Sequence, residues 1–351
     1  MTAPIEYVIR RLSEYDGPPL RLMEVCGTQT AEISHNGIRN LLSTAIQMIS
    51  GPGCPVCVTV SAYIDRLIEL SGQEGTTVVS FGDLFRVPGS RESLSEAKAA
   101  GGRAEMVYAP AQILDMARKQ PEKQFVFAAV GFETTAPVYA GIIKKAKEEG
   151  LKNLRFLTSI KTMPAAIRWI CAHEPDIQGF LAPGHVCAVT GMKDYEEIAR
   201  EYGIPFVVSG FSPEELITAI YGLVCLRGRG QTRNFYPAVV RPEGNPEARA
   251  VMHEVFEPCG AAWRGIGRIE GSGLRIRAAF REFDAGSDGL EEDIRKNSQC
   301  RCAQVLLGEI SPGDCPLFGK VCTPATPQGA CMVSAEGSCF HYYSGNEGGS
   351  R

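Results

Sequence analysis

The last 52 residues of the chain contain six of its 13 cysteines. Four of them, Cys300, Cys315, Cys322 and Cys339, are separated by 14, 6 and 16 residues. A cubane iron–sulfur cluster needs four thiolates that converge from several directions, and gaps of this size allow a loop-rich segment to wrap around an inorganic core. Structural zinc usually takes its ligands from tight two-residue knuckles, and this segment has none. The spacing therefore predicts an iron–sulfur site, with Cys302 and Cys331 beside it as a candidate redox pair.

The size and charge of the chain predict a soluble protein of two or three domains. Its 351 residues exceed one ordinary core, and its formal net charge of −4 favours neither a nucleic acid nor a membrane as partner. No stretch approaches the roughly 18 consecutive apolar residues of a membrane span, and the N-terminus lacks the apolar core of a secretion signal. We expect a cytoplasmic protein, whose cysteines are metal ligands or redox thiols rather than structural disulfides.

Residues 20–228 repeat a short β-branched or aromatic run, a Gly-rich turn and an amphipathic stretch, which is typical of βα units in a parallel sheet. The predicted strands lie at residues 20–25, 46–49, 76–80, 125–130, 154–160, 177–181 and 204–208. Because seven strands exceed one small sheet, we expect an α/β fold with two lobes that face each other across a cleft. A polar, Pro-containing break at residues 119–123 predicts a boundary between lobes at 1–120 and 121–235.

After Gly230 the composition changes to Gly, Pro and Arg with few long apolar runs. One helix is predicted at about 246–256, ahead of the cysteine-rich part. Such a region cannot build a large core, so a cluster bonded to four thiolates would hold much of it together. The third predicted domain is therefore an iron–sulfur module at residues 236–351.

The unusual residues of the α/β part follow its predicted strands. They are CGT at 26–28, GPGCPVC at 51–57, FGD at 81–83, GFETT at 131–135 and APGHV at 182–186. In open α/β sheets, ligands bind in the crevice outside the carboxyl ends of the strands. Two lobes with these edges facing each other would gather all five motifs around one cleft, with the Cys26 thiol directed into it.

The cysteines of these motifs have functional and plainer interpretations. Cys54 and Cys57 form a Cys-x-x-Cys unit, which is either a dithiol that cycles through a disulfide, half of a zinc knuckle or two buried thiols. The flanking glycines and prolines favour a redox or metal-handling role. Cys26 lies on a Gly turn at a strand end, and is either a small buried residue or a candidate ligand for a soft or borderline metal.

Glu133 and His185 are the other candidate site residues. Glu133 is a candidate general base, metal ligand or solvated turn carboxylate. His185 is placed to tune a metal or donate a proton, although a structural histidine is the commoner case. Nucleotide chemistry has no support, because the chain has neither a phosphate loop nor a complete dinucleotide fingerprint. Packing roles are expected for Cys171, Cys187, Cys225 and Cys259.

Taken together, the motifs at residues 24–28, 51–57, 131–135 and 182–186 and the spaced C-terminal cysteines resemble the HypD family of hydrogenase maturation proteins. The likeness runs from about residue 20 to the C-terminus. Further similar segments are WRGIG at 263–267, CPLFG at 315–319 and MVSAEG at 332–337. Several motifs in the same order are far more specific than a single Cys-x-x-Cys pair.

The resemblance implies a scaffold on which the iron of a nickel–iron hydrogenase receives its cyanide and carbon monoxide ligands. By this likeness, Cys26 would hold the iron together with a cysteine of the small chaperone HypC, and HypE would supply cyanide. A [4Fe-4S] cluster would be bound by Cys300, Cys315, Cys322 and Cys339, and the choice of Cys300 over Cys302 rests on the family spacing. Electrons would pass toward the cleft through Cys302–Cys331 and Cys54–Cys57.

The chain departs from the family pattern after its first cysteine motif, where Gln29 and Ala31 stand in place of histidines. A divergent maturation factor and a paralogue that serves another metal centre are both compatible with this departure. Two other functions are compatible with the cysteines. An iron–sulfur-dependent thiol–disulfide reductase is the alternative, and a zinc-stabilised interaction module is a third interpretation.

Overall fold

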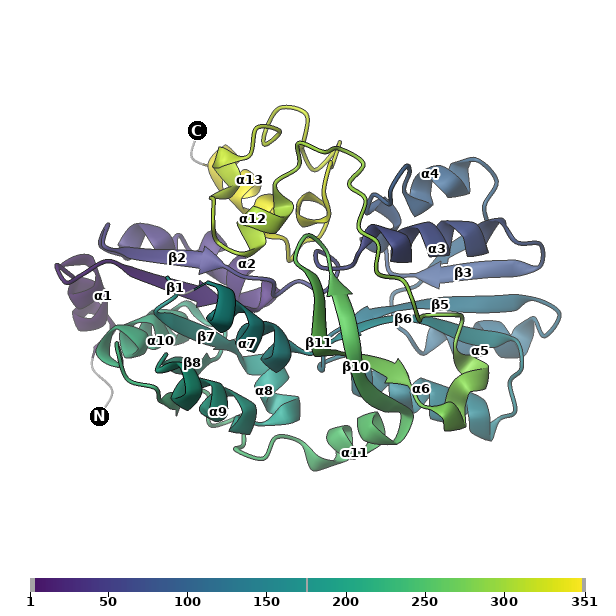
Figure 1. The fold of residues 1–351 in the computed structure, drawn as a ribbon, viewed down its shortest axis with the longest axis horizontal. Helices are drawn as coiled ribbons and strands as arrows, with labels where there is room; N and C mark the ends of the chain where they lie inside the picture. The colour runs from purple at the N-terminus through teal and green to yellow at the C-terminus, as the bar shows by residue number, and fades with distance from the viewer. Residues whose placement is uncertain (1–3, 175, 349–351) are drawn as a thin grey trace.

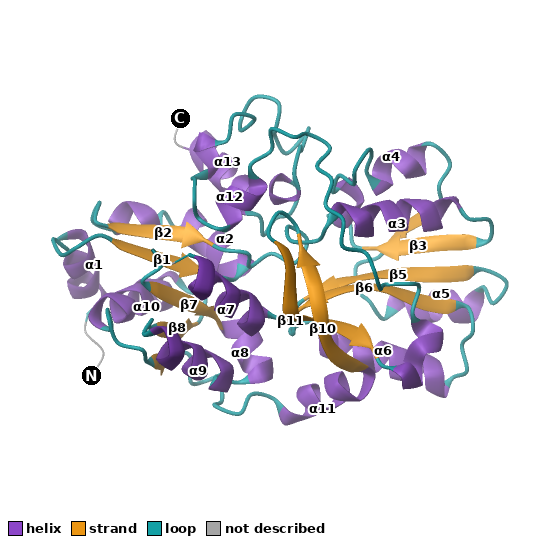
Figure 2. Ribbon diagram, viewed as in Figure 1, coloured by secondary structure: helices purple, strands orange, loops and turns teal. Residues whose placement is uncertain are grey.

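Two β-sheets carry the helices of the α/β part on both of their faces. The computed structural model describes residues 4–174 and 176–348. Figures 1 and 2 show the two sheets side by side, with the C-terminal segment lying between them at the top of the view. The α/β class with largely parallel sheets, predicted from the sequence, is confirmed.

The first sheet has the strand order β2-β1-β7-β8-β9, and all of its neighbouring strands are parallel. Its strands are β1 (Leu20–Glu24), β2 (Ile46–Ser50), β7 (Gly179–Pro183), β8 (Phe206–Ser209) and β9 (Thr232–Asn234). Met23 pairs in register with Ile49 on one side and with Phe180 on the other. The central strands are buried on both faces, as continuous apolar runs predict.

The second sheet has the order β10-β11-β6-β5-β3-β4. Its strands are β3 (Thr76–Ser80), β4 (Ala104–Met106), β5 (Gln124–Gly131), β6 (Leu154–Lys161), β10 (Phe256–Trp263) and β11 (Gly267–Ile276). The strands from β3 to β6 pair in parallel, whereas β10 and β11 form an antiparallel hairpin that adds to the edge of β6. The hairpin therefore extends a sheet that begins 180 residues earlier in the chain.

Helices cover both faces of each sheet. Their bounds are α1 (Ile5–Ser13), α2 (Gly27–His35), α3 (Ser61–Gly72), α4 (Leu94–Ala99), α5 (Gln112–Lys119), α6 (Ala136–Glu148), α7 (Met163–His173), α8 (Gly184–Thr190), α9 (Lys193–Tyr202), α10 (Pro213–Cys225), α11 (Pro246–Val255), α12 (Cys302–Leu306) and α13 (Ser338–Gly348). Alternate side chains of β5 pack against helices on opposite faces of the second sheet. Phe125 and Phe127 pack with residues of α5 and α6, while Val126 and Ala128 pack with residues of α3.

The carboxyl ends of the two sheets point toward each other. In Figure 1 the arrows of β1 and β2 run to the middle of the molecule from one side, and the arrow of β3 reaches it from the other. The chain passes from the first sheet to the second between β2 and α3, and returns between β6 and α7. This arrangement places the loops after β1, β2, β5 and β7 at the junction of the sheets.

The strand positions predicted from the sequence agree with the structure to within two residues, but the predicted lobe boundaries do not coincide with divisions between sheets. Strands β7 and β8 join β1 and β2 instead of forming a sheet with β5 and β6. Residues 246–283 belong to the second sheet and its helices rather than to a separate C-terminal module. Apolar runs identify strands but do not show which distant strands pair.

The polar break at residues 119–123 is an ordinary turn between α5 and β5. The buried side chain of Asn153 donates from Nδ2 to the carbonyl oxygens of Ala117, Gln120 and Lys123, at 3.0, 3.1 and 3.0 Å. These bonds satisfy carbonyl groups at the end of α5 that the helix itself leaves free. The turn is thus tied to β6 within a single layer, so it is not a linker between domains.

We predict that Asn153→Ala lowers the free energy of unfolding by about 1–3 kcal/mol, because several buried carbonyl groups lose their donor. Asn36→Ala is the matched control, since the exposed Asn36 amide donates to Glu32 at the surface. Urea titration followed by circular dichroism measures both variants. Equal stability of the two would show that the Asn153 bonds do not hold the turn.

No helix within the described ranges combines the length and apolar character needed to cross a bilayer.

Candidate functional site

Cys26 occupies the N-cap position of α2, directly after β1. The loop that follows β2 packs against it so closely that a Cβ atom on Gly53 would lie 2.3 Å from the Cys26 amide nitrogen. The Gly27 N–H donates to the Gly53 carbonyl oxygen at 3.2 Å, which joins the two loops. Gly53 of the 51–57 motif is therefore required, because the Cys26 main chain lies too close for a side chain.

The side chain of Glu24 holds the turn between β1 and α2 through hydrogen bonds. Its carboxylate is fully buried and accepts hydrogen bonds from the Cys26 N–H at 3.2 Å and from Thr30 Oγ1 at 2.6 Å. Burial raises the pKa of Glu24, while the hydrogen bonds and the Arg39 guanidinium lower it. No role was predicted for Glu24, and charge alone does not mark it, because Arg21 lies in the same short strand.

The Cys26 thiol is less accessible than expected. Cys26 is only 8% exposed, and burial raises the pKa of its thiol to about 11. The backbone N–H groups of Thr28 and Gln29 act in the opposite sense, because they stabilise the thiolate at the start of α2. The side chain of Glu336 lies against Gly27, so the C-terminal segment covers this turn. The prediction that the thiol opens freely into a cleft is wrong.

Cys54 and Cys57 form a disulfide, with 5.2 Å between their Cα atoms. Both residues are buried, and Cys57 Sγ lies 4.0 Å from the carbonyl oxygen of Ala330. The 51–57 loop thus contacts Cys26 on one side and the C-terminal segment on the other. A Cys-x-x-Cys disulfide agrees with the redox interpretation in its chemistry.

Glu133 reaches across from the second sheet. Its Oε1 accepts the Met163 N–H at 2.8 Å, and its Oε2 has no hydrogen-bond partner among the described residues. Burial raises the pKa of Glu133 to about 7. The residue also lines a cavity of about 360 Å³ between the sheets. Of the proposed roles, the solvated turn carboxylate is excluded, because Glu133 is 2% exposed.

Two residues that sequence analysis passed over lie near Glu133 and Cys26. Cys187 and Tyr195 are fully buried, and each has its pKa raised by burial and by the charges of Glu133 and Cys26. Cys187 was interpreted as a packing residue from its strand-like surroundings. No local pattern marks either residue, because the cluster arises only when the two sheets meet.

His185 lies at the surface instead of in this buried cluster. Its exposed ring stacks on Phe211 with 4.0 Å between the centroids. Partial burial lowers its pKa. Its position at the start of α8 places it on the same sheet edge as Cys26, because β7 pairs with β1.

The C-terminal cysteines share one hydrophobic core with the first sheet. The sulfur atoms of Cys300 and Cys302 are 3.3 Å apart, and the Cys302, Cys331 and Cys339 thiols hydrogen-bond with one another. The bond to Cys302 lowers the pKa of Cys300 to about 6. A Cβ atom on Gly329 would approach the sulfurs of Cys302 and Cys300 to 2.4 and 2.8 Å, so a glycine is needed there.

Cys315 and Cys322 are the other two cysteines of the C-terminal segment, and they lie near the same sulfur atoms. Cys322 accepts the Gln328 N–H at 3.4 Å, and its pKa responds to the charges of Cys300 and Cys315. Within the described residues, no three side chains of His, Cys, Asp or Glu are arranged to hold a single metal ion. Thiols converging from several loops suit an iron–sulfur centre in donor chemistry, because such clusters take thiolate ligands. The proximity of Cys302 and Cys331 fits a redox pair.

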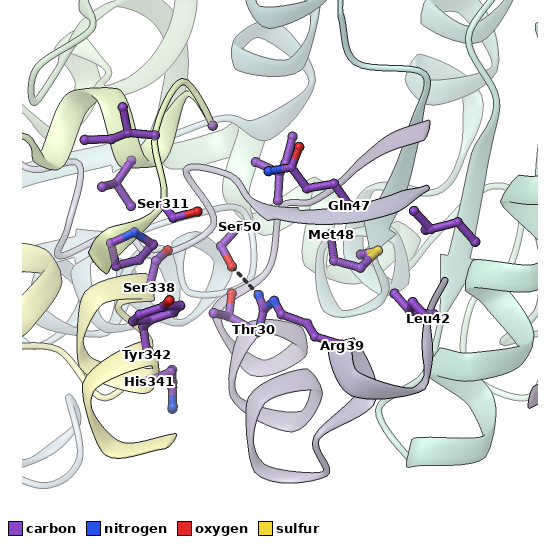
Figure 3. A pocket seen from close by; sticks show the side chains of 16 residues that line it. Thr30, Arg39, Leu42, Gln47, Met48, Ser50, Ser311, Ser338, His341 and Tyr342 are labelled. Atoms are coloured by element: carbon purple, nitrogen blue, oxygen red, sulfur yellow. Dashed lines mark hydrogen bonds between the residues drawn. The ribbon is translucent and has the colours of Figure 1, made fainter. Parts of the chain in front are cut away.

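A second cavity, of about 250 Å³, separates the first sheet from the C-terminal segment. Figure 3 shows Thr30, Arg39 and Ser50 on one side of it and Ser311, Ser338 and Tyr342 on the other. Arg39 donates from Nη2 to Ser50 Oγ at 2.9 Å. The guanidinium thus lies between this cavity and the carboxylate of Glu24 that supports Cys26.

Gln29, which follows the CGT motif, is fully buried. Its Nε2 donates to the Ala182 carbonyl oxygen at 3.3 Å, so the side chain ties α2 to the end of β7. Its Oε1 has no hydrogen-bond partner among the described residues. Gln29 therefore supplies a polar donor at the junction of the CGT and APGHV motifs.

Comparisons with known proteins agree on one family. The family model described as "HypD: Hydrogenase formation hypA family" matches residues 3–346. The chain is 41% identical over 352 residues to the hydrogenase maturation factor HypD of Rhodobacter capsulatus, covering 95% of this chain and 93% of that protein. It is 41% identical to HypD of Cupriavidus necator (93% and 90% covered) and 38% identical to HypD of Escherichia coli (93% and 89% covered).

We predict that Gly53→Ala destabilises the fold by about 1–3 kcal/mol, because the added methyl group collides with the Cys26 main chain. The variant should also raise the alkylation rate of the Cys26 thiol. Gly141→Ala is the control: its Cβ would meet nothing within 4 Å in the middle of α6, so stability should stay unchanged or rise. Chemical denaturation and mass spectrometry of alkylated peptides measure these effects, and wild-type values for Gly53→Ala would contradict the proposed contact.

The stability of the fold should depend on pH through the buried carboxyl group of Glu133. Folding raises its pKa from 4.5 to about 7, so between these pH values the folded chain holds a proton that the unfolded chain has released. The stabilising contribution is complete below the lower value and is lost as the pH rises through the higher one. Glu133→Gln removes this titration, so its stability relative to wild type should increase from pH 4.5 to pH 7 and then level off. A constant difference in urea midpoint across this range would contradict the assignment.

Proposed function

This chain belongs to the HypD family of hydrogenase maturation factors, and we propose that it is the scaffold on which the Fe(CN)2CO centre of a nickel–iron hydrogenase is assembled. The iron is cargo, held by the Cys26 sulfur together with a cysteine of a HypC-type chaperone. A HypE-type protein supplies cyanide, and assembly takes place in the cytoplasm. The observation that carries the proposal is the contact of the Cys26 turn with a disulfide loop that also touches the cysteine-rich C-terminal segment.

The environment of Cys26 suits a metal-binding thiolate that forms only when cargo arrives. With a pKa of about 11 the free thiol is protonated near neutral pH, so binding of iron must displace the proton. The N–H groups of Thr28 and Gln29 then stabilise the sulfur charge. Glu24 holds the turn so that the sulfur need not reorganise. Low-spin iron with strong-field ligands favours such a soft donor.

A resident [4Fe-4S] cluster is the second part of the proposal. Cys300, Cys315, Cys322 and Cys339 would hold it, and when bound it would supply single electrons. The support is that these thiols belong to one core with the 51–57 loop. Cys302 and Cys331 contact each other, Cys57 of the disulfide lies 4.0 Å from the Ala330 carbonyl oxygen, and Gly53 of the same loop contacts Cys26. The order of these groups suits a path of thiol–disulfide exchange toward Cys26.

The alternative function is an iron–sulfur-dependent thiol–disulfide reductase, and the Cys54–Cys57 disulfide beside free thiols favours it. Infrared spectra of the protein purified after co-expression with its maturation partners distinguish the two functions. The scaffold should show cyanide and carbonyl stretches that Cys26→Ala lacks. Disulfide-reducing activity without those stretches would favour the reductase.

We predict that anaerobically purified protein is brown and contains roughly four iron and four sulfide per chain. Cys315→Ala should lose this colour and make the C-terminal segment sensitive to protease, because the cluster contributes to its folding. Cys26→Ala should keep the cluster but fail to restore hydrogenase activity in a deletion strain. The control is Cys225→Ala, which removes an exposed thiol of α10 and should behave as wild type. Stoichiometric zinc in a colourless sample would contradict the cluster.

A further inference from the structure

Lys161 is a buried cation that the proposed function leaves unused. It ends β6, is 3% exposed, and donates one hydrogen bond from Nζ to Ser159 Oγ at 3.2 Å. An ammonium group carries three donors, so two of them find no partner within the described part of the chain. Burying a charge in this way is costly unless a counter-charge is present.

No carboxylate of the described residues forms an ion pair with Lys161. The thiol of Cys259 lines the same cavity and acts electrostatically on Lys161, but burial raises the pKa of that thiol, so it is neutral near pH 7. The Trp263 ring, whose centroid lies 5.8 Å from Nζ, offers only a weak cation–π contact. Burial lowers the pKa of Lys161 to about 8, which still leaves the charged form predominant at pH 7.

The Lys161 side chain lines a cavity of about 140 Å³ between β6, the β10–β11 hairpin and the segment after residue 286. Arg268 and Arg275 also line this cavity. Both arginines are partly exposed, and each is paired with glutamates, Arg268 with Glu270 and Glu291 and Arg275 with Glu257. Asp288 lines the cavity as well. The arginines are paired with glutamates, whereas no ion pair among the described residues includes Lys161.

We propose that this cavity is a binding site for a small oxyanion, such as phosphate or bicarbonate, with Lys161 as its principal ligand. The cavity is large enough for one such ion, and the two free donors of the ammonium group can bind its oxygens. The site belongs to the edge of the second sheet and does not depend on the proposed maturation role of Cys26.

The test compares full-length wild type with Lys161→Met by thermal unfolding, with phosphate or bicarbonate exchanged for chloride at constant pH and ionic strength. Either oxyanion should raise the Tm of wild type, since a ligand that binds only the folded state stabilises it. Lys161→Met should lose that response and, without oxyanion, unfold at a higher temperature than wild type because it no longer buries a lone charge. The control is Lys152→Met, which removes an exposed lysine near the same strand and should keep the wild-type response.

The two anions separate the possible ligands: a response to phosphate alone assigns a tetrahedral oxyanion, and a response to bicarbonate alone assigns a planar one. The proposal is overturned if neither anion raises the Tm of wild type, or if Lys161→Met responds equally.

Discussion

The packing of the 51–57 loop against the first turn of α2 is the contact on which the arrangement of the site depends. Gly53 allows the two main chains to touch, and the Gly27 N–H closes the contact with a hydrogen bond. This loop is also where the chain leaves the first sheet for the second. One short segment therefore positions Cys26, places the Cys54–Cys57 disulfide and sets how the sheets meet.

Buried charge is the second constraint. Glu24, Glu133 and Lys161 are almost wholly buried, and for each of them burial opposes the charged form. Apolar residues of similar size would often stabilise a fold more, so groups of this kind are weak evidence for stability. Glu24 has hydrogen-bond donors around it, whereas in the described structure Glu133 Oε2 has no partner and the Lys161 ammonium makes one hydrogen bond. Such incomplete satisfaction is typical of functional sites.

Much of the fold could be predicted from the sequence because its strands are short runs rich in apolar and β-branched residues, some of them continuously apolar, as in 125–130. Pairing could not be predicted, since β1 and β7 are neighbours across more than 150 residues of chain and nothing local records it. The site residues divide in the same way, into those with a local sequence motif and those that only distant contacts bring together. The motif cysteines and Glu133 were found from strand-end positions, whereas Cys187 and Tyr195 become neighbours of Glu133 only through the assembly of the two sheets. Glu24 and Lys161 each end a strand, but Arg21 and Arg155 lie in the same two strands, so the sequence does not show which charge is buried.

The burial of Cys26 links the C-terminal segment to the site in a way that the spacing of cysteines does not suggest. Glu336 covers Gly27, and Ser34 Oγ of α2 donates to the carbonyl oxygen of His341 in α13 at 3.2 Å. Cys331 and Cys339 flank Glu336 in the chain and belong to the core shared with the first sheet. The segment that carries these sulfurs is therefore also the segment that covers Cys26. The cysteine-rich segment is thus both a source of thiols and the cover of the proposed iron site, and the two roles are coupled through one packed core.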